Sequence, residues 1–327
     1  MRYEDAGVSF HRAERLLETL KHHVDLRSFG GLFPLASLLQ DYGDPVLVAS
    51  TDGIGTKIRL ALQAGRLEGL GQDLVAMVCN DLVTLGARPL FFLDYFAVAR
   101  LEPEHHAVLL QGLLRALEKI QCPLLGGETA ELPGLFAHAE DFDIAGFGVG
   151  IVERAKIPDP EHLAPEDLCI GLPSSGPHAN GFSLIRKILD IHPNLAQTQV
   201  TPSATLLDWL LTPTRLYVQP VLRAFATGKV KAASHITGGG IPENLARVLN
   251  SRVDAVMDRS SIATPPGFRI LQEAGNVPEE EMWRVFNMGI GFILVVAPED
   301  VQEVLKALGE GTIIGTLTEG EGRVRWL

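Results

Sequence analysis

Residues 45–57 read PVLVASTDGIGTK, a β-rich run that passes into a glycine loop. Helix-like sequence resumes at residues 58–64, so this stretch predicts a strand, a loop and a helix in succession. Asp52 is expected at the end of the strand, inside the loop. The same order returns at residues 168–191, where an apolar run is followed by SSGPHANG and a helical pattern. The chain is therefore expected to have a mixed α/β fold of the α+β class.

The rest of the chain also alternates helical and β-type patterns. Helices are expected at residues 10–24, 74–85, 103–121, 242–249 and 299–308, and strands at residues 90–98, 142–152, 232–236, 289–296 and 313–318. From residue 124 the sequence predicts a strand that leaves into a loop before Glu128. Residues 157–165 are polar and proline-rich, which is typical of a domain boundary. We expect an N-terminal domain over residues 1–157 and a C-terminal domain over residues 158–327.

Composition narrows the class of protein. The 327 residues favour two domains, each large enough to bury a core. With 46% hydrophobic and 21% charged residues, the chain is globular and is not a collagen, a coiled coil or a disordered protein. The net charge is −12 and both halves are acidic. No nucleic acid partner is expected, because binding its backbone needs a basic face.

Cysteine usage and hydropathy bear on the compartment. The three cysteines lie far apart and form no C-x-x-C pair, so neither a zinc site nor a disulfide framework is indicated. A reducing cytoplasm is the expected localisation. Acidic residues stand at the start of the chain, and no apolar run reaches the ~18 residues of a membrane span. Neither export nor a membrane partner is expected.

Several familiar catalytic and nucleotide-binding motifs do not occur in the sequence. The patterns G-x-x-x-x-G-K-[ST], G-x-G-x-x-G after a strand, H-E-x-x-H and G-x-S-x-G are all absent. What remains is a set of acids flanked by apolar and small residues, namely Asp52, Asp81 and Glu128. Such carboxylates suit a Mg²⁺-nucleotide site, because this hard cation takes oxygen ligands and shares them with phosphates. The alternatives are a turn or cap residue for Asp52, a structural salt bridge for Asp81 and a solvated loop acid for Glu128.

A run of small residues, Thr237, Gly238, Gly239 and Gly240, precedes Pro242 and the helix expected there. Glycines let successive backbone N–H groups converge on an anion at a helix N-terminus. The run therefore predicts a phosphate site, and the alternative is an ordinary glycine turn between a strand and a helix.

Taken in order, five motifs resemble those of one enzyme family, the phosphoribosylformylglycinamidine cyclo-ligases, also called aminoimidazole ribonucleotide synthetases. The motifs are TDGIGTK at residues 51–57, DLVTLGARP at 81–89, GGETAELPG at 126–134, SSGPHANG at 174–181 and HITGGG at 235–240. The resemblance runs from YEDAGV at residues 3–8 to FNMG at residues 286–289, which is nearly the whole chain. Five motifs in the same order make the resemblance highly specific.

The resemblance implies an enzyme of de novo purine biosynthesis that uses ATP to close formylglycinamidine ribonucleotide to 5-aminoimidazole ribonucleotide. The amide oxygen of the substrate would be phosphorylated, and the amidine nitrogen would then displace phosphate as the ring forms. The resemblance also implies a homodimer. In it, the N-terminal sheet would join that of a second subunit in a β-barrel, beside a C-terminal α/β sandwich.

The resemblance further implies roles for residues of this chain. Mg²⁺ would be held on the triphosphate by Asp52, Asp81 and Glu128. ATP contacts are expected at Asp52, Gly53, Thr56, Lys57, Asn80, Asp81 and Gly86. Substrate phosphate contacts are expected at Thr237, Gly238, Gly239 and Gly240. Lys21 would meet the phosphates or the developing oxyanion. His178 and His235 would transfer protons or orient the substrate, with the assignment between them open, unless they are buried core histidines.

Related ATP-using enzymes are the alternatives to this assignment. Selenophosphate synthetase would carry a reactive cysteine near the N-terminus, and a hydrogenase maturation factor would carry a C-terminal one. Here the first cysteine is Cys79 and the last residues read RVRWL. Thiamine-phosphate kinase would carry a further acid at residues 238–240, and a catalytically silent nucleotide-binding regulator would have lost some of the three acids. None of these expectations fits the chain.

Overall fold

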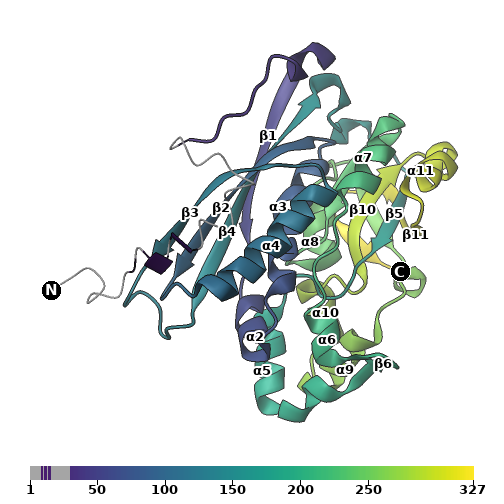
Figure 1. The fold of residues 1–327 in the computed structure, drawn as a ribbon. Helices are drawn as coiled ribbons and strands as arrows, with labels where there is room; N and C mark the ends of the chain where they lie inside the picture. The colour runs from purple at the N-terminus through teal and green to yellow at the C-terminus, as the bar shows by residue number, and fades with distance from the viewer. Residues whose placement is uncertain (1–8, 10, 13, 16–29) are drawn as a thin grey trace.

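The structure is a computed structural model that describes residues 9, 11, 12, 14, 15 and 30–327. Two large sheets organise these residues, and helices pack against both of them (Figure 1). The mixed α/β class predicted from the sequence is confirmed. The helix predicted at residues 10–24 lies largely outside the described residues, and Lys21 lies wholly outside them.

The first sheet comes from the N-terminal half of the chain and has the strand order β1-β4-β2-β3. Its strands are β1 (Pro45–Gly53), β2 (Arg88–Val98), β3 (Leu124–Glu131) and β4 (Phe142–Glu153). β4 pairs antiparallel with β1 and β2, whereas β3 pairs parallel with β2. The chain crosses from β2 to β3 through α4 (Pro103–Lys119), because parallel neighbours need a crossover connection.

One face of this sheet is covered by α3 (Glu68–Val83), which packs on β1, β2 and β4 and also against α4. Glycines of β4 permit the close approach, since a Cβ on Gly148 would lie 2.8 Å from Cγ1 of Val78. Successive strand residues point to opposite faces. Ser50 and Asp52 therefore share the face that α3 covers, and Leu47 lies on the other face.

The second sheet comes from the C-terminal half and has the order β12-β9-β11-β5-β10-β8. Its strands are β5 (Leu168–Pro173), β8 (Val230–His235), β9 (Val253–Met257), β10 (Ile290–Val296), β11 (Thr312–Glu319) and β12 (Val324–Trp326). All neighbours are antiparallel except β12 and β9. Every residue of β10 is buried, so this strand lies at the centre of the C-terminal core.

Shorter elements complete the two halves. The remaining helices are α2 (Lys57–Ala64), α5 (Phe182–Ile191), α6 (Leu206–Leu210), α7 (Val218–Ala226), α8 (Gly240–Ala246), α9 (Pro266–Gly275), α10 (Glu279–Val285) and α11 (Val301–Leu308). A two-stranded sheet joins β6 (Gln199–Thr201) and β7 (Ala204–Thr205). The 3₁₀ helices are η2 (Leu38–Asp41), η3 (Arg154–Lys156), η4 (Pro160–His162), η5 (Pro193–Gln197), η6 (Arg259–Ser261) and η7 (Pro298–Asp300). No helix in the described part of the chain has the length and apolar character needed to cross a membrane.

Some element boundaries differ from the sequence expectations. Strand β3 continues to Glu131, so Glu128 lies inside a strand and the loop predicted there is wrong. Pairing with β2 on one side carries the backbone past the two glycines at residues 126 and 127. Helix α8 begins at Gly240, two residues before Pro242. The sequence did not predict β9, α9 or α10; of these, β9 and α10 hold too few residues to reveal a period.

Candidate active site

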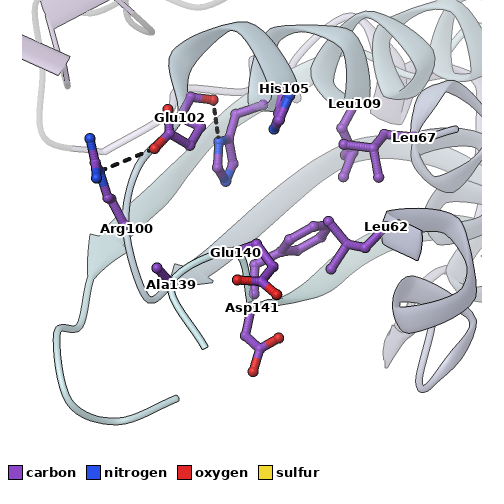
Figure 2. Close-up of a pocket in the computed structure, with 11 residues that line it drawn as sticks. Leu62, Leu67, Arg100, Glu102, His105, Leu109, Ala139, Glu140 and Asp141 are labelled. Atoms are coloured by element: carbon purple, nitrogen blue, oxygen red, sulfur yellow. Dashed lines mark hydrogen bonds and ion pairs between the residues drawn. The ribbon is translucent and has the colours of Figure 1, made fainter. Parts of the chain in front are cut away.

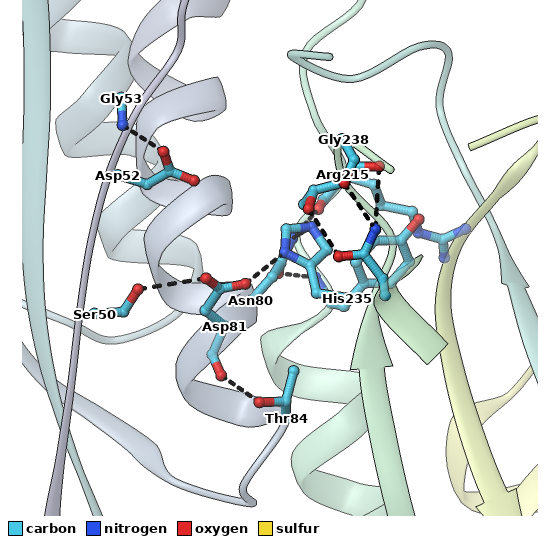
Figure 3. A network of polar contacts seen from close by, with 12 residues as sticks. Ser50, Asp52, Gly53, Asn80, Asp81, Thr84, Arg215, His235 and Gly238 are labelled. Atoms are coloured by element: carbon cyan, nitrogen blue, oxygen red, sulfur yellow. Dashed lines mark hydrogen bonds and ion pairs between the residues drawn. The ribbon is translucent and has the colours of Figure 1, made fainter. Parts of the chain in front are cut away.

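A contact between the two halves of the chain forms the centre of the site. Asp81, in the last turn of α3, has its Oδ1 2.9 Å from Nδ1 of His235, the last residue of β8. On the other side, the hydroxyl of Ser50 in β1 donates to Oδ2 of Asp81 at 3.5 Å. Figure 3 shows Asp81 between Ser50 and His235. Helix α3 carries this carboxylate, and one strand from each sheet, β1 and β8, supplies a side chain that positions it.

The ring of His235 is oriented by Asn80. The Nδ2 group of Asn80 lies 3.4 Å from Nε2 of His235 and also donates to the Arg215 carbonyl at 2.9 Å. Oδ1 of Asn80 accepts the Tyr217 N–H at 2.9 Å. An amide NH₂ only donates, so Nε2 of His235 accepts and Nδ1–H donates to Asp81. This network assigns the tautomer of His235.

Asn80 itself is fully buried, and both ends of its amide are engaged within the protein. The amide of Asn80 thus holds neighbouring groups of the protein, and the expected contact between Asn80 and ATP stays a prediction. Burial differs sharply across the central pair, since the His235 side chain is 2% exposed and the Asp81 side chain is 45% exposed. Asp81 is the member of the pair that a ligand can reach.

A cavity of about 280 Å³ opens beside this pair. It is lined by residues of β1, α3, β8 and α8, namely Val48, Ala49, Ser50, Asp81, Thr84, Leu85, Ala233, Ser234, His235, Thr237, Asn244, Arg247 and Val248. The carboxylate of Asp81 lies on one wall, and the threonine that begins the glycine run lies on another. The two motifs that the sequence treated separately thus meet at one cavity.

Asp52 lies two residues after Ser50, on the same face of β1 (Figure 3). Its Oδ1 accepts the N–H of Gly53 at 2.7 Å. Burial raises the pKa of Asp52, the Gly53 hydrogen bond opposes this, and the neighbouring Asp81 carboxylate raises the pKa further. A divalent cation would relieve this repulsion between two carboxylates. Asp52 and Asp81 therefore fit a Mg²⁺ site.

Glu128 does not join these two acids in the described chain. It lies on β3, at the opposite edge of the sheet from β1. It also pairs with Tyr95, on the face that α3 does not cover. Among the described residues, no group of three or more His, Cys, Asp or Glu side chains could hold a metal ion. Within one chain, sheet topology separates Glu128 from the pair Asp52 and Asp81, and a Mg²⁺ contact of Glu128 stays a prediction.

Lys57 is completely buried where the two halves meet. Its Nζ donates to Oδ1 of Asp73 and to the carbonyls of His178 and Thr212, each at 2.9 Å. The N–H and hydroxyl of Thr214 donate to the same Asp73 oxygen. Burial lowers the pKa of Lys57 and raises that of Asp73, and the attraction within the pair opposes both shifts. The Lys57 side chain thus forms a buried ion pair with Asp73, and its expected ATP contact stays a prediction.

His178 is also fully buried, with a backbone φ of 60°. Its Nε2 accepts the N–H of Ser175 at 3.2 Å. Burial lowers the pKa of His178 well below its usual value, so the ring stays neutral. It does not line the cavity beside Asp81. This burial agrees with the alternative of a buried core histidine that the sequence left open, and the catalytic role of His178 stays a prediction.

The glycine run lies between β8 and α8. The side-chain amide of Asn244 donates to the carbonyls of Thr237, Gly238 and Gly240 at 3.3, 3.1 and 2.8 Å. Gly239 has φ 96° and Gly240 has φ 60°, which are left-handed conformations that glycine adopts readily. Asn244 thus turns three carbonyls of the loop inward, and the N–H of Gly240 donates to the Thr237 carbonyl at 3.1 Å.

Thr56 and Gly86, which were also predicted to contact ATP, do not line the cavity beside Asp81. Thr56 lies at the N-terminus of α2, and its hydroxyl is 3.1 Å from that of Ser183 in α5. Gly86 lies in the turn after α3 with φ 69° and lines a different cavity, beside Phe225. Gly86 is therefore a turn residue, and the expected ATP contact there stays a prediction.

Two charged residues of this region were missed by the sequence analysis. Arg247 lines the cavity beside the glycine run and brings a cation to it, but an arginine after a helix carries no motif. Asp94 on β2 shares the α3 side with Asp52, because both pair with Gly146 of β4. Burial raises the pKa of Asp94 to about 7. The sequence feature that could have identified Asp94 is the presence of an acid inside the apolar run LFFLDYF at residues 90–96.

Comparison with protein families gives the class to which this fold and site belong. The N-terminal domain of AIR synthase related protein matches residues 36–152, and the C-terminal domain of AIR synthase related protein matches residues 164–327. The chain belongs to the AIR synthase related family. A phosphoribosylformylglycinamidine cyclo-ligase of Carboxydothermus hydrogenoformans is 46% identical over 336 residues, covering 98% of this chain and 97% of the relative. The resemblance inferred from the five motifs is confirmed.

Solved structures share the fold at low identity. The hydrogenase maturation protein HypE in complex with ATP superposes with a TM-score of 0.72 at 16% identity, covering 98% of this chain and 93% of that one. Thiamine-monophosphate kinase from Stenotrophomonas maltophilia superposes with a TM-score of 0.65 at 18% identity, covering 98% and 96%. At these identities the likeness shows the fold alone.

Proposed function

We propose that the protein is an ATP-dependent cyclo-ligase that closes formylglycinamidine ribonucleotide to 5-aminoimidazole ribonucleotide in de novo purine biosynthesis. The observation that carries this function is the 46% identity to a phosphoribosylformylglycinamidine cyclo-ligase along 98% of the chain. Asp52, Asp81 and the glycine run lie within the matched domains. ATP converts the amide oxygen into a phosphate leaving group, and the amidine nitrogen then attacks the same carbon to form the ring. ADP and phosphate leave.

The test is direct. Purified protein, ATP, Mg²⁺ and formylglycinamidine ribonucleotide should yield ADP and 5-aminoimidazole ribonucleotide in equal amounts, and EDTA should stop both. ATP hydrolysis without the cyclised product would contradict the proposed activity and favour a different ATP-using enzyme of the same fold.

Asp52 and Asp81 are proposed to hold Mg²⁺ on the triphosphate. Mg²⁺ usually binds through one or two carboxylates and completes its shell with phosphates and water, which agrees with the two acids available here. When bound, it would neutralise charge that develops during phosphoryl transfer. Within the chain, Ser50 and His235 orient the Asp81 carboxylate, as outer-shell groups commonly do for metal ligands. His235 is accordingly a positioning residue in this proposal, because both of its ring nitrogens are engaged.

The ribose 5′-phosphate of the substrate is proposed to bind at the glycine run, with Arg247 as its counter-charge. The inward-turned carbonyls held by Asn244 support this proposal, as does the shared cavity with Asp81. A planar guanidinium is well suited to phosphate oxygens. Substrate bound there would extend from the C-terminal half toward the acids of the N-terminal half.

Replacing Gly238 with Ala should raise the KM for the ribonucleotide about tenfold and leave the KM for ATP unchanged. The added methyl group would stand where the phosphate approaches the backbone. A Cβ at Gly238 meets only Oδ1 of Asn180, at 3.5 Å, so the loop itself tolerates the change. Gly239 is unsuitable for this test, because its φ of 96° and a Cβ contact of 2.7 Å to Glu243 would strain any substitution. Steady-state kinetics with each substrate varied in turn measure the two KM values. A rise in the KM for ATP alone would show that the glycine run binds the triphosphate and not the substrate phosphate.

The protein is further proposed to form a homodimer through the face of its N-terminal sheet opposite α3. That face carries Leu47, Tyr95 and Phe147, which are 60%, 43% and 39% exposed. Contiguous exposed apolar side chains of this kind mark interaction surfaces. Joining two such faces would form the barrel that the family resemblance implies. A cytoplasmic location is proposed as well, in keeping with three free and buried cysteines.

Leu47→Asp should convert the dimer into a monomer in analytical ultracentrifugation at micromolar concentration, because it places a charge inside the proposed interface. Ile191→Asp is the matched control, since Ile191 is 64% exposed at the end of α5, away from the sheet. This control should sediment as the wild-type protein does. A wild-type chain that sediments as a stable monomer would contradict the homodimer.

A further inference from the structure

A second cavity, of about 250 Å³, lies in the N-terminal half between α2, α4 and the start of β4. None of its lining residues lines the cavity beside Asp81. Figure 2 shows Leu62, Leu67 and Leu109 together on one side of it, and Arg100 and Glu102 on the other. It is thus a separate cavity, with a largely apolar wall and charged residues at its rim.

One polar atom in this cavity has no hydrogen-bond partner in the part of the chain that the structure describes. His106, on α4, lines the cavity and is 6% exposed. Its Nδ1 lies 2.7 Å from the Glu102 carbonyl oxygen, which can only accept, so Nδ1 carries the proton. Nε2 is then an acceptor, and it is buried without a hydrogen-bond partner among the described residues. A buried acceptor of this kind costs free energy until a donor reaches it.

The surroundings keep the His106 ring neutral. Burial lowers the pKa of His106, and the hydrogen bond to Glu102 opposes that shift only in part. The ring of Phe96 meets His106 edge-on at 5.7 Å between centroids, and that of Phe142 lies at 5.8 Å. Of these two rings only Phe142 lines the cavity, where it joins the aliphatic side chains in an apolar wall that favours a flat, uncharged ligand.

The volume of the cavity and the charges at its rim further limit the class of ligand that can bind. A cavity of about 150 Å³ accepts benzene, so the larger volume here has room for a fused two-ring system. Drug-sized ligands occupy about 300–1,000 Å³, so a whole nucleotide would exceed it. At the rim, Arg100 pairs with Glu102 and Arg59 pairs with Asp141, which leaves Glu140 as an acid in excess among the described residues. A phosphate group near this rim would be repelled.

We propose that this cavity binds a neutral, flat, purine-sized nitrogen heterocycle that donates an N–H to Nε2 of His106. The aliphatic side chains contact the faces of the ring system, and the acidic rim selects against phosphorylated forms. The site thus recognises a free nucleobase or a nucleoside, by chemistry that does not involve the residues proposed for cyclisation.

Two small probes isolate the hydrogen bond. 9-Methyladenine and 9-methylpurine are both neutral and alike in shape, but only 9-methyladenine carries an amino N–H. By calorimetric titration, the wild-type protein should bind 9-methyladenine about tenfold more tightly than 9-methylpurine, as expected when a buried acceptor gains its donor. In His106→Phe this ratio should fall to about one. His192→Phe is the matched control, because His192 is exposed and does not line this cavity, and its ratio should stay near ten.

A second variant keeps the test decisive if His106→Phe does not fold. Leu62→Trp adds bulk at the cavity wall and should abolish binding of both probes while far-ultraviolet circular dichroism stays unchanged. Failure of 9-methyladenine to bind the wild-type protein at millimolar concentration would overturn the proposal, as would equal binding to Leu62→Trp. Tighter binding of AMP than of 9-methyladenine, or displacement of the probe by ATP, would assign the cavity to the base of a nucleotide and overturn the neutral-ligand selectivity.

Discussion

Lys57→Met should lower the free energy of unfolding by about 3–5 kcal/mol, because it leaves the buried Asp73 carboxylate without a counter-charge. Methionine fills a similar volume, so the loss reports on charge and not on a cavity. The two carbonyls that Lys57 now binds, those of His178 and Thr212, would also lose their donor. Urea unfolding at fixed protein concentration measures the change.

Two controls separate this effect from a general weakening of the domain contact. The double variant Lys57→Met with Asp73→Leu removes both charges and should recover much of the lost stability, since an apolar pair can replace a buried ion pair. Arg66→Ala breaks another ion pair between the two halves. The side chains of that pair, Arg66 and Asp208, are 43% and 42% exposed. Arg66→Ala should cost less than about 1 kcal/mol. Equal losses for Lys57→Met and Arg66→Ala would contradict the role assigned to the buried pair.

Asp81→Asn should lower kcat for cyclisation by about 10²–10³-fold while the fold persists, and Asp52→Asn should act in the same direction. Asparagine keeps the shape of the Asp81 side chain, and its Oδ1 can still accept from Nδ1 of His235. What is lost is the negative charge proposed to hold Mg²⁺ on the triphosphate. Single-turnover measurements of ADP and of the cyclised product would report the loss at the chemical steps.

The matched control for these variants is Asp44→Asn. Asp44 is 60% exposed and pairs with Arg154 just before β1 begins, so its charge lies outside the site. Its kcat should equal that of the wild-type protein. Raising the Mg²⁺ concentration should restore part of the activity of Asp81→Asn if metal affinity is what the variant loses. Near-normal turnover in both Asp81→Asn and Asp52→Asn would contradict the proposal that these two carboxylates hold Mg²⁺.

Local sequence determined the elements that carry the site. The run PVLVASTDGIGTK encodes β1, a glycine loop and α2, because β-branched and apolar residues favour a strand and glycine ends it. The five motifs determined the family, since they combine loop chemistry with a fixed order along the chain. The acids Asp52 and Asp81 were recognisable because a carboxylate is unusual within apolar sequence.

Only the tertiary structure decided which of these residues meet. Asp81 and His235 stand 154 positions apart, and sequence spacing carries no information about such a contact. Glu128 looked equivalent to Asp52, yet strand order puts the two on opposite edges of one sheet. Lys57 and His178 looked like site residues and are buried instead. Periodicity reports the local backbone and the face that is buried, whereas the partner of a buried polar group depends on which distant segments pack against it.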